Sequence, residues 1–361
     1  MENLLDFAVA STKEFATKNT ELQKIVFDQQ QARSLQRFAK EIADIGGPQA
    51  VGAKTKAAFA ASELKVSLSI EQHAVLQRYS DGLLSVLVYE GLEKVNGLAL
   101  PSKLPTLENL ENDTDVLLIA ARNQILLKLV DHKTFAYDIE NDGKLVRLVG
   151  NFKGGGAELL QDEPRKLELS SHSGLALGPH TETPYWCSVK AVDGHSPAPS
   201  ALILSGVWNP AKEPTTVIPA APLLEKLGIV NTLALTSKYF HFTRSDSFVD
   251  GMGEDGRFVS IVDFDENSGF SLRFNAYRFS VDKDAPQLVK TAFAKLLEAI
   301  AGADLIKYSL SQESAMVINN CRALHCRDVV EDNRRLLIRL FGSSKFAQPV
   351  VLSQDPLILR G

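Results

Sequence analysis

Cysteine is scarce in this sequence. Only three occur in 361 residues, and Cys187, Cys321 and Cys326 cannot all pair with one another. Their spacing also matches no zinc ribbon. So few cysteines argue against a disulfide scaffold, and a reducing cytoplasm is the expected location.

Long apolar runs and basic blocks are also missing. No run approaches the roughly 20 apolar residues that a membrane-spanning helix needs. The first residues, Met1 to Asp6, lack the basic and apolar regions of a secretory signal. The chain carries 39 Lys and Arg against 44 Asp and Glu, a net charge of −5. We therefore expect neither a membrane association nor a surface built to bind nucleic-acid phosphates.

What the sequence does contain is typical of a globular protein, with 45% hydrophobic and 23% charged residues. Up to about residue 95, apolar residues recur at spacings of three and four, which predicts helices. The segment Gly46–Pro48 interrupts this pattern, and Ser69–Gln72 resembles the start of a further helix. We predict that residues 1–114 form a mainly helical part that packs on the core.

Strand patterns dominate the rest of the chain. Residues 116–121 form an apolar segment that fits a buried strand or a helix, and 135–146 read as a β-hairpin. An amphipathic helix is expected over 286–301. Many strands without regular βαβ alternation predict an α+β fold whose core, over 115–361, is a double-stranded β-helix (jelly roll) flanked by helices. A segment rich in glycine and acid within 237–257 is expected to form a lid, with an ordinary surface loop as the alternative.

A histidine and a carboxylate lie two residues apart at His180 and Glu182, in an extended segment bounded by prolines. Residues i and i+2 of a strand point to the same face, so the two side chains can bind one ion. About one such pair is expected by chance in a chain of this composition, so the pair alone is not diagnostic. His325 completes a two-histidine, one-carboxylate set, which leaves coordination positions open as non-haem iron(II) oxygenases require. Hydrolytic zinc sites use the same ligands.

Arg339 distinguishes these two readings. Arg339 lies fourteen residues after His325 on a predicted strand. This spacing can place its permanently charged guanidinium group beside the metal. Arginine pairs with a carboxylate through two parallel hydrogen bonds, so Arg339 is expected to anchor the distal carboxylate of an oxo acid. An exposed charge on the strand is the alternative.

The order of these motifs resembles the clavaminate synthase-like branch of the taurine dioxygenase family, the iron(II)/2-oxoglutarate oxygenases that include free arginine hydroxylases. The resemblance extends over about residues 115–345. The segments that carry it are Ser170-Ser171, Gly178–Glu182, Thr215–Val217, Asn320–Arg327 and Arg339.

The resemblance implies that His180, Glu182 and His325 bind iron(II), and that Arg339 and Thr216 hold 2-oxoglutarate. With O2 as the other cosubstrate, the enzyme would hydroxylate an unactivated C–H bond of a free amino acid or an amino-acid-derived molecule, releasing succinate and CO2. Related halogenases replace the carboxylate ligand with a small residue, so Glu182 favours hydroxylation or desaturation. The alternatives are a zinc-dependent hydrolase with the same ligands and a non-catalytic jelly-roll binding protein.

The resemblance also suggests substrate contacts. In this branch a glutamine and the glutamate ligand hold the α-amino group of the substrate, which points to Gln124 and Glu182. Arginine hydroxylases carry two acids after an Arg-Phe pair, but here Asn275 and Tyr277 stand in those positions, and neither neutralises a cation. We therefore expect a substrate less basic than arginine, unless Asp246 or Asp250 of the lid restores a negative charge.

Overall fold

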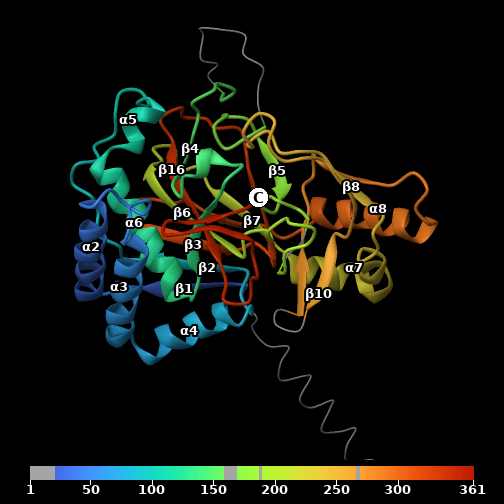
Figure 1. Cartoon of the computed structure of the whole chain (residues 1–361), viewed down its shortest axis with the longest axis horizontal. Coiled ribbons are helices and arrows are strands. Elements are labelled where there is room, and N and C mark those ends of the chain that lie inside the picture. The colour runs from blue at the N-terminus through green and yellow to red at the C-terminus, as the bar shows by residue number, and fades with distance from the viewer. Residues whose placement is uncertain (1–20, 158–168, 187–188, 266–268) are drawn as a thin grey trace, which may run out of the picture.

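A computed structural model describes residues 21–157, 169–186, 189–265 and 269–361 (Figure 1). The expectations for residues 1–20 and for Cys187 lie outside these ranges. None of the described helices has both the length and the apolar character needed to cross a membrane. The helices in the described ranges are α2 (Gln29–Ala43), α3 (Ala53–Ser67), α4 (Ile70–Ser80), α5 (Leu107–Glu111), α6 (Thr114–Leu129), α7 (Ala220–Ala234), α8 (Gln287–Ala301) and the 3-10 turn η1 (Asn141–Gly143).

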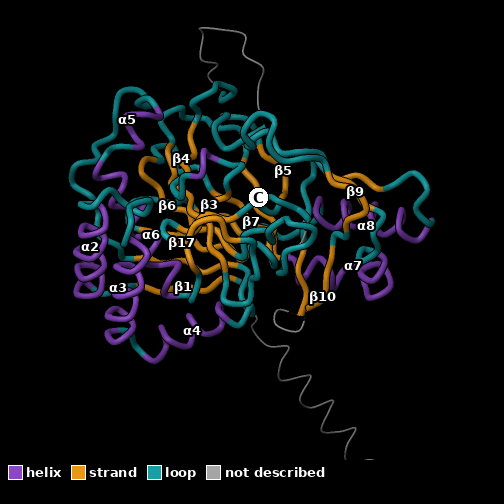
Figure 2. The backbone as a smooth tube through the Cα atoms, in the orientation of Figure 1, coloured by secondary structure: helices purple, strands orange, loops and turns teal. Residues whose placement is uncertain are grey.

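The strands gather in the middle of the molecule, with helices on its flanks (Figure 2). In chain order the described strands are β1 (Leu22–Val26), β2 (Val86–Glu90), β3 (Lys133–Tyr137), β4 (Arg147–Gly150), β5 (Leu177–His180), β6 (Ala201–Trp208), β7 (Thr215–Pro219), β8 (Phe240–Phe242), β9 (Gly256–Val259), β10 (Val262–Asp265), β11 (Gly269–Leu272), β12 (Phe279–Val281), β13 (Ile306–Tyr308), β14 (Ser314–Asn319), β15 (Ala323–Arg327), β16 (Leu336–Ser343), β17 (Val351–Gln354) and β18 (Leu357–Leu359).

The largest sheet is mixed and has nine strands. Its order is β1-β2-β14-β6-β16-β3-β18-β17, and β4 pairs with β16 beside this path. Strands β1 and β2 come from the first 114 residues, so this part of the chain extends the main sheet as well as covering it. Helix α6, which begins at Thr114, packs with α2 and α3. The residues on the two sides of the expected boundary after residue 114 therefore pack against each other.

Helices α2, α3 and α6 form a layer on one side of the main sheet (Figure 1). Capping boxes start two helices: Asp28 with Gln31 at α2, and Ser69 with Gln72 at α4, where the sequence predicted a helix start. Helix α6 contacts β3, β6 and β16. Because it lies between the sheet and the outer helices, it is buried almost all round, which explains the apolar pattern that fitted both a strand and a helix.

A smaller antiparallel sheet, in the order β13-β7-β15-β5, lies opposite the main sheet. Apolar side chains fill the space between them, including Leu202 and Met316 from the main sheet and Val217 from the smaller one. Leu324 points to the other side, into a core shared with α7 and α8. The fold is thus a mixed α and β fold, with two facing sheets between two groups of helices.

The predicted hairpin over residues 135–146 is wrong. Strands β3 and β4 do not pair with each other; both pair with β16, β4 along Leu336–Arg339 and β3 along Phe341–Ser343. The two strands lie end to end along one edge of β16, so the chain between them loops outward instead of turning back. This outward loop carries Glu140 to the position opposite Arg339, with consequences for the site.

Candidate metal and substrate site

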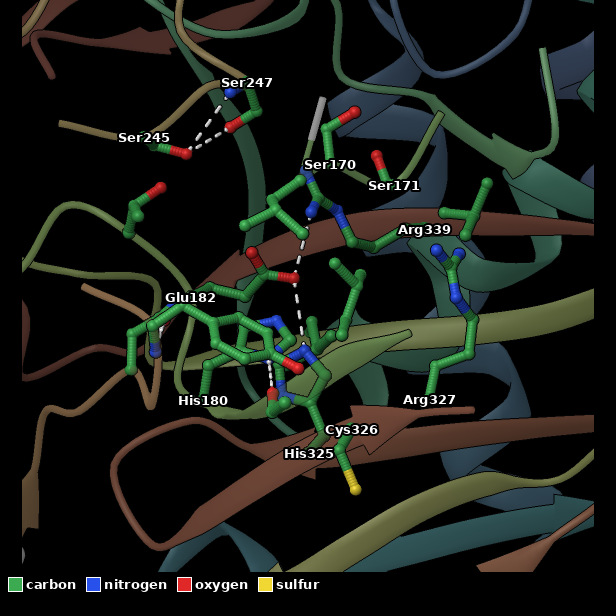
Figure 3. Close-up of a pocket in the computed structure, with 18 of the residues that line it drawn as sticks. Ser170, Ser171, His180, Glu182, Ser245, Ser247, His325, Cys326, Arg327 and Arg339 are labelled. Atoms are coloured by element: carbon green, nitrogen blue, oxygen red, sulfur yellow. Dashed lines mark hydrogen bonds and ion pairs between the residues drawn. The ribbon is translucent and has the colours of Figure 1, made fainter. Parts of the chain in front are cut away.

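A cavity of about 110 Å³ lies between the two sheets, and the three predicted metal ligands meet on its wall. His180 ends β5 and lies directly opposite His325 in the β5–β15 ladder. Glu182 follows two residues later, and ligand atoms of the three side chains lie within 4.8 Å of one another. Figure 3 shows both imidazoles and the carboxylate turned toward a common centre. The structure therefore brings together the three side chains that the sequence singled out.

The protonation states of this group suit metal ligation. Burial and the neighbouring imidazole of His325 lower the pKa of His180 to about 3, so its ring is neutral at pH 7. The Nδ1 atom of His180 lies 2.7 Å from the carbonyl oxygen of Gly178, which leaves Nε2 as the ligand atom. Burial raises the pKa of Glu182, but the charge of Arg339 and the two imidazoles outweigh it, and the net shift is downward. Glu182 is therefore ionised.

Asn320 holds the backbone of the carboxylate ligand. Its Oδ1 accepts a hydrogen bond of 2.7 Å from the Glu182 backbone N–H, and its Nδ2 donates to the carbonyl oxygen of Pro199. Asn320 is 1% exposed, so both bonds are shielded from water. This side chain fixes the chain direction between His180 and Glu182, and it gives a physical role to the asparagine of the predicted histidine motif.

Arg339 reaches the ligand group, but its terminal nitrogens are already paired. Nη1 donates to Glu182 Oε1 at 2.9 Å and Nη2 donates to Glu140 Oε1 at 2.7 Å. The guanidinium also lies over the ring of Phe341, 4.0 Å from its centroid. Burial lowers the pKa of Arg339, but the two carboxylates outweigh burial and raise it. Arg339 is thus a fixed cation between two buried acids.

Two further arginines, Arg327 and Arg335, line the cavity. Arg327 is 9% exposed; its Nη2 donates to the carbonyl oxygens of Ser173 and Leu175, whereas its Nε and Nη1 have no hydrogen-bond partner. The Nε atom of Arg335 lies 3.8 Å from Glu213 Oε2, beyond hydrogen-bonding distance. Burial, together with the charge of Arg335, lowers the pKa of Arg327 to about 9. Two buried cations therefore share one nearby carboxylate, and Thr215 lines the same cavity.

Strand alternation explains this placement and could have predicted it. Arg327 lies two residues after His325 on β15, and Arg335 directly precedes β16, four residues before Arg339; all four side chains line the cavity. The same alternation corrects the expectation for Thr216. Thr216 pairs with Cys326 and does not line the cavity, whereas Thr215 does. The sulphur of Cys326 points away from the ligand group (Figure 3). Thr215 takes its place.

The outer part of the cavity is lined by polar side chains and by one arginine, Arg278. Asn275 and Tyr277 lie among them, and Asn275 Nδ2 donates to the Tyr185 hydroxyl at 2.9 Å. Asp246 does not line the cavity; it lies at the rim, 3.5 Å from Arg278. Four serines complete the lining, none of which the sequence singled out as a substrate contact: Ser170, Ser171, Ser245 and Ser247.

The segment expected to form a lid contributes two of these serines. Between β8 and β9, Arg244 holds the segment together through hydrogen bonds that it donates to the carbonyl oxygens of Phe248 and Met252. Phe248 forms an isolated β-bridge with Glu140, and Asp246 accepts a hydrogen bond from the Leu169 backbone N–H. The segment therefore covers one side of the cavity and contacts the loop that carries Glu140.

Gln124, expected to hold the substrate amino group, does not reach this cavity. It lies on α6, on the other side of the main sheet, and it lines a separate cavity with Lys54 and His132. The error arose because the segment was a buried helix and not an early strand of the core. Glu140 was missed for the related reason that its loop was interpreted as a hairpin.

Replacing Gln124 with leucine is expected to leave succinate formation within about twofold of wild type. The side chain is 3% exposed and its Oε1 has no hydrogen-bond partner, so an apolar replacement of similar size removes an unsatisfied group. The free energy of unfolding should stay equal or rise by about 1–3 kcal/mol. Denaturant unfolding and a steady-state assay of succinate release check these two expectations. A large loss of activity in a stable variant would show that Gln124 does contribute to the active site.

No family model and no curated protein matches this sequence. Solved structures do resemble it. An asparagine oxygenase in complex with Fe(II), 2S,3S-3-hydroxyasparagine and succinate is 16% identical, with a TM-score of 0.66 over 88% of this chain and 92% of its own. The non-heme iron oxygenase OrfP is 17% identical both with Fe and alpha-ketoglutaric acid (TM-score 0.66; 90% and 95% covered) and with Fe and L-Arg (TM-score 0.64; 90% and 94%). At these identities the likeness establishes a common fold.

Proposed function

We propose that this protein is an iron(II)- and 2-oxoglutarate-dependent dioxygenase that hydroxylates a free amino acid or a related small molecule, with release of succinate and CO2. One observation carries the proposal: two histidines and a glutamate meet in a cavity that three arginines, Arg327, Arg335 and Arg339, also line. The common fold with iron oxygenases solved with 2-oxoglutarate, succinate and hydroxylated amino acids supports it.

The proposed core is a double-stranded β-helix. The two facing sheets, with the cavity between them, support this arrangement, and the ligands lie on strands β5 and β15 of the smaller sheet. A ligand set of this kind is suited to a cavity that excludes water, because charges interact more strongly there than in water.

The residues present fit iron(II). Two imidazoles and one carboxylate form the ligand set of non-haem iron sites, and His180, Glu182 and His325 would hold the metal. When bound, iron(II) supplies the activation of O2. The protein itself orients the ligands: Gly178 fixes the ring of His180, and Asn320 fixes the backbone of Glu182. Glu182 fills the position that is vacated in the related halogenases, which favours a hydroxylated product.

The inner arginines are the better candidates for holding 2-oxoglutarate. Arg327 and Arg335 are buried like charges with unpaired donors, and a carboxylate between them would satisfy both. Thr215 would add a hydroxyl hydrogen bond. Arg339, the residue favoured by its spacing, already donates to Glu140 and Glu182. We therefore assign the distal carboxylate of 2-oxoglutarate to Arg327, Arg335 and Thr215.

A zinc hydrolase would use the same three ligands. It would also need a general base beside the metal, and among the described residues that line the cavity the only acid is Glu182 itself, which is a ligand. The unsatisfied donors of Arg327 and Arg335 have no evident use in hydrolysis. These features favour the oxygenase.

The proposal is tested by turnover of the purified protein in air. With iron(II) and 2-oxoglutarate it should release succinate slowly, and faster when its substrate is present. A chelator should abolish this release, and zinc in place of iron should not support it, because zinc has no redox chemistry. The proposal fails if iron(II) yields no succinate while the zinc-loaded protein hydrolyses esters or amides.

A further inference from the structure

A second cavity, of about 250 Å³, lies where helix α3, the C-terminal half of α6 and the start of β3 meet. The two helices pack side by side (Figure 1), and α6 also contacts β3. No described residue lines both this cavity and the one that holds the candidate metal ligands. A molecule bound in the second cavity would therefore be held by side chains that take no part in the metal chemistry.

The lining of this second cavity is positively charged. Lys54, Lys128 and Lys133 line it, and none of the described lining residues is acidic. Lys54 Nζ donates to the carbonyl oxygen of Gln354 at 2.6 Å, which satisfies one hydrogen bond but does not balance the charge. Within the described ranges, no residue forms an ion pair with Lys128 or Lys133. Because three cations lack a protein counter-charge here, the cavity attracts anions.

Two acids lie next to lining residues in the chain, but each has another partner. Asp131 precedes His132 and pairs with Lys65 Nζ at 3.0 Å. Asp355 follows the residue that accepts from Lys54, and it accepts a hydrogen bond of 2.9 Å from the Gly52 backbone N–H at the start of α3. Neither acid lines the cavity, so the three lysines stay available to an anion from solution.

Buried polar side chains complete the lining. Gln124 is 3% exposed and Thr134 is 5% exposed, and neither Gln124 Oε1 nor Thr134 Oγ1 has a hydrogen-bond partner. Buried polar groups are costly to leave unsatisfied, and each such group calls for an explanation. His132 Nδ1 lies 2.7 Å from the carbonyl oxygen of Val130, and burial lowers the pKa of His132 to about 4. The ring is therefore neutral at pH 7, and its Nε2 is an acceptor. An amide, a hydroxyl and an imidazole thus surround the part of the cavity away from solvent.

Lysine without arginine favours a phosphate over a carboxylate. A guanidinium pairs with a carboxylate through two parallel hydrogen bonds, whereas a lysine ammonium acts as a point charge and is a common phosphate ligand. A phosphate monoester carries a charge of about −1.5 to −2 at pH 7, which matches several cations better than a single carboxylate does. Ala57 and Ala58 contribute small side chains to the wall, which leaves room for the organic part of such a molecule.

We propose that the cavity between α3, α6 and β3 is a binding site for a small phosphate monoester whose organic part carries hydroxyl groups. The three lysines hold the phosphate group. The hydroxyl groups hydrogen-bond to the amide of Gln124, the hydroxyl of Thr134 and the imidazole of His132. The site does not depend on iron or 2-oxoglutarate, so it goes beyond the proposed function and can be tested apart from it.

Calorimetric titration of the full-length protein tests the chemistry of the ligand. The probes are glycerol 3-phosphate, ribose 5-phosphate and glucose 6-phosphate, each compared with its unphosphorylated parent, with inorganic phosphate and with citrate. We expect at least one ester to bind at one site per chain, about tenfold or more tighter than inorganic phosphate, and its parent to show no binding. The inference is overturned if no ester binds more tightly than inorganic phosphate, or if citrate binds as tightly as the best ester.

Substitutions locate the bound ester. Lys128→Gln and Gln124→Leu should each weaken its binding about fivefold or more, because one removes a cation and the other the amide. Lys56→Gln is the matched control: it makes the same charge change on α3 at a lysine that does not line the cavity, and the affinity should stay unchanged. Arg335→Met should also leave the affinity unchanged, since Arg335 lines the other cavity.

Wild-type affinity in both Lys128→Gln and Gln124→Leu would overturn the inference. So would a loss of binding in Arg335→Met, which would place the ester beside the candidate metal ligands. Thermal unfolding without the ester checks that each variant is folded. Because neither iron nor 2-oxoglutarate takes part in these titrations, their failure would leave the proposed function standing, and a failure of the proposed function would leave this site standing.

Discussion

Replacing His180 with alanine is expected to abolish iron(II) binding and, with it, succinate formation. Only Glu182 and His325 would remain as protein ligands, and no other described side chain completes the group. Changes in the residues behind metal ligands cost about 10–100-fold in affinity or activity, so loss of a ligand itself should exceed about 100-fold. Anaerobic calorimetric titration with iron(II) measures the effect, with one ion bound per wild-type chain.

His73→Ala is the matched control for this prediction. His73 is an exposed histidine on α4, far from the cavity lining, and its loss should leave iron binding unchanged. If His180→Ala bound iron(II) with the affinity of the wild type, the ligand assignment would be wrong.

The second large effect is expected at Arg335. Arg335→Met keeps much of the apolar volume but removes a buried cation, so the KM for 2-oxoglutarate should rise. Truncating one partner of a buried charge pair costs about 2–5 kcal/mol, which corresponds to roughly 30-fold or more. The affinity for iron(II) should change little, because Arg335 does not contact the metal ligands. Steady-state kinetics with varied 2-oxoglutarate and a parallel iron titration separate the two quantities.

Arg339→Met provides the comparison that decides between two anchors. We assign the distal carboxylate of 2-oxoglutarate to Arg327 and Arg335, so Arg339→Met should raise the KM for 2-oxoglutarate less than Arg335→Met does. The opposite pattern, with 2-oxoglutarate affected more by Arg339→Met than by Arg335→Met, would restore the assignment that the spacing after His325 suggested.

The three side chains of the candidate metal site could be found from the sequence because strand geometry is local. His180 and Glu182 are separated by two residues in an extended segment, and a motif around His325 pointed to a partner strand. The β5–β15 ladder then places the two histidines directly opposite each other. No long-range information was needed beyond the pairing of those two strands.

Spacing along the chain was a poorer guide to the arginines. The spacing of fourteen residues placed Arg339 correctly beside Glu182, but it could not show that the terminal nitrogens of Arg339 already have acidic partners. That depends on Glu140, which reaches Arg339 only because β3 and β4 pair end to end with β16. A hairpin and an outward loop have the same local turn residues, and only the position of β16 distinguishes them.

The helical part shows the same limit. The capping box at Ser69 marked the start of α4 correctly, since caps depend on residues three apart. The strands β1 and β2 were not predicted, because each has only five residues. The pairing of β1 with β2 and of β2 with β14 is a long-range contact. The sequence singled out Thr216, but Thr215 lines the cavity. A shift of one residue along a strand moves the side chain to the opposite face.

The visible spectrum of the protein under anaerobic conditions tests the central claim most directly. Adding 2-oxoglutarate to the protein loaded with iron(II) should produce a weak charge-transfer band, absent without 2-oxoglutarate and absent in His180→Ala. A wild-type protein that binds iron(II) but shows no band, or a band of full strength in His180→Ala, would contradict the proposed iron and 2-oxoglutarate site.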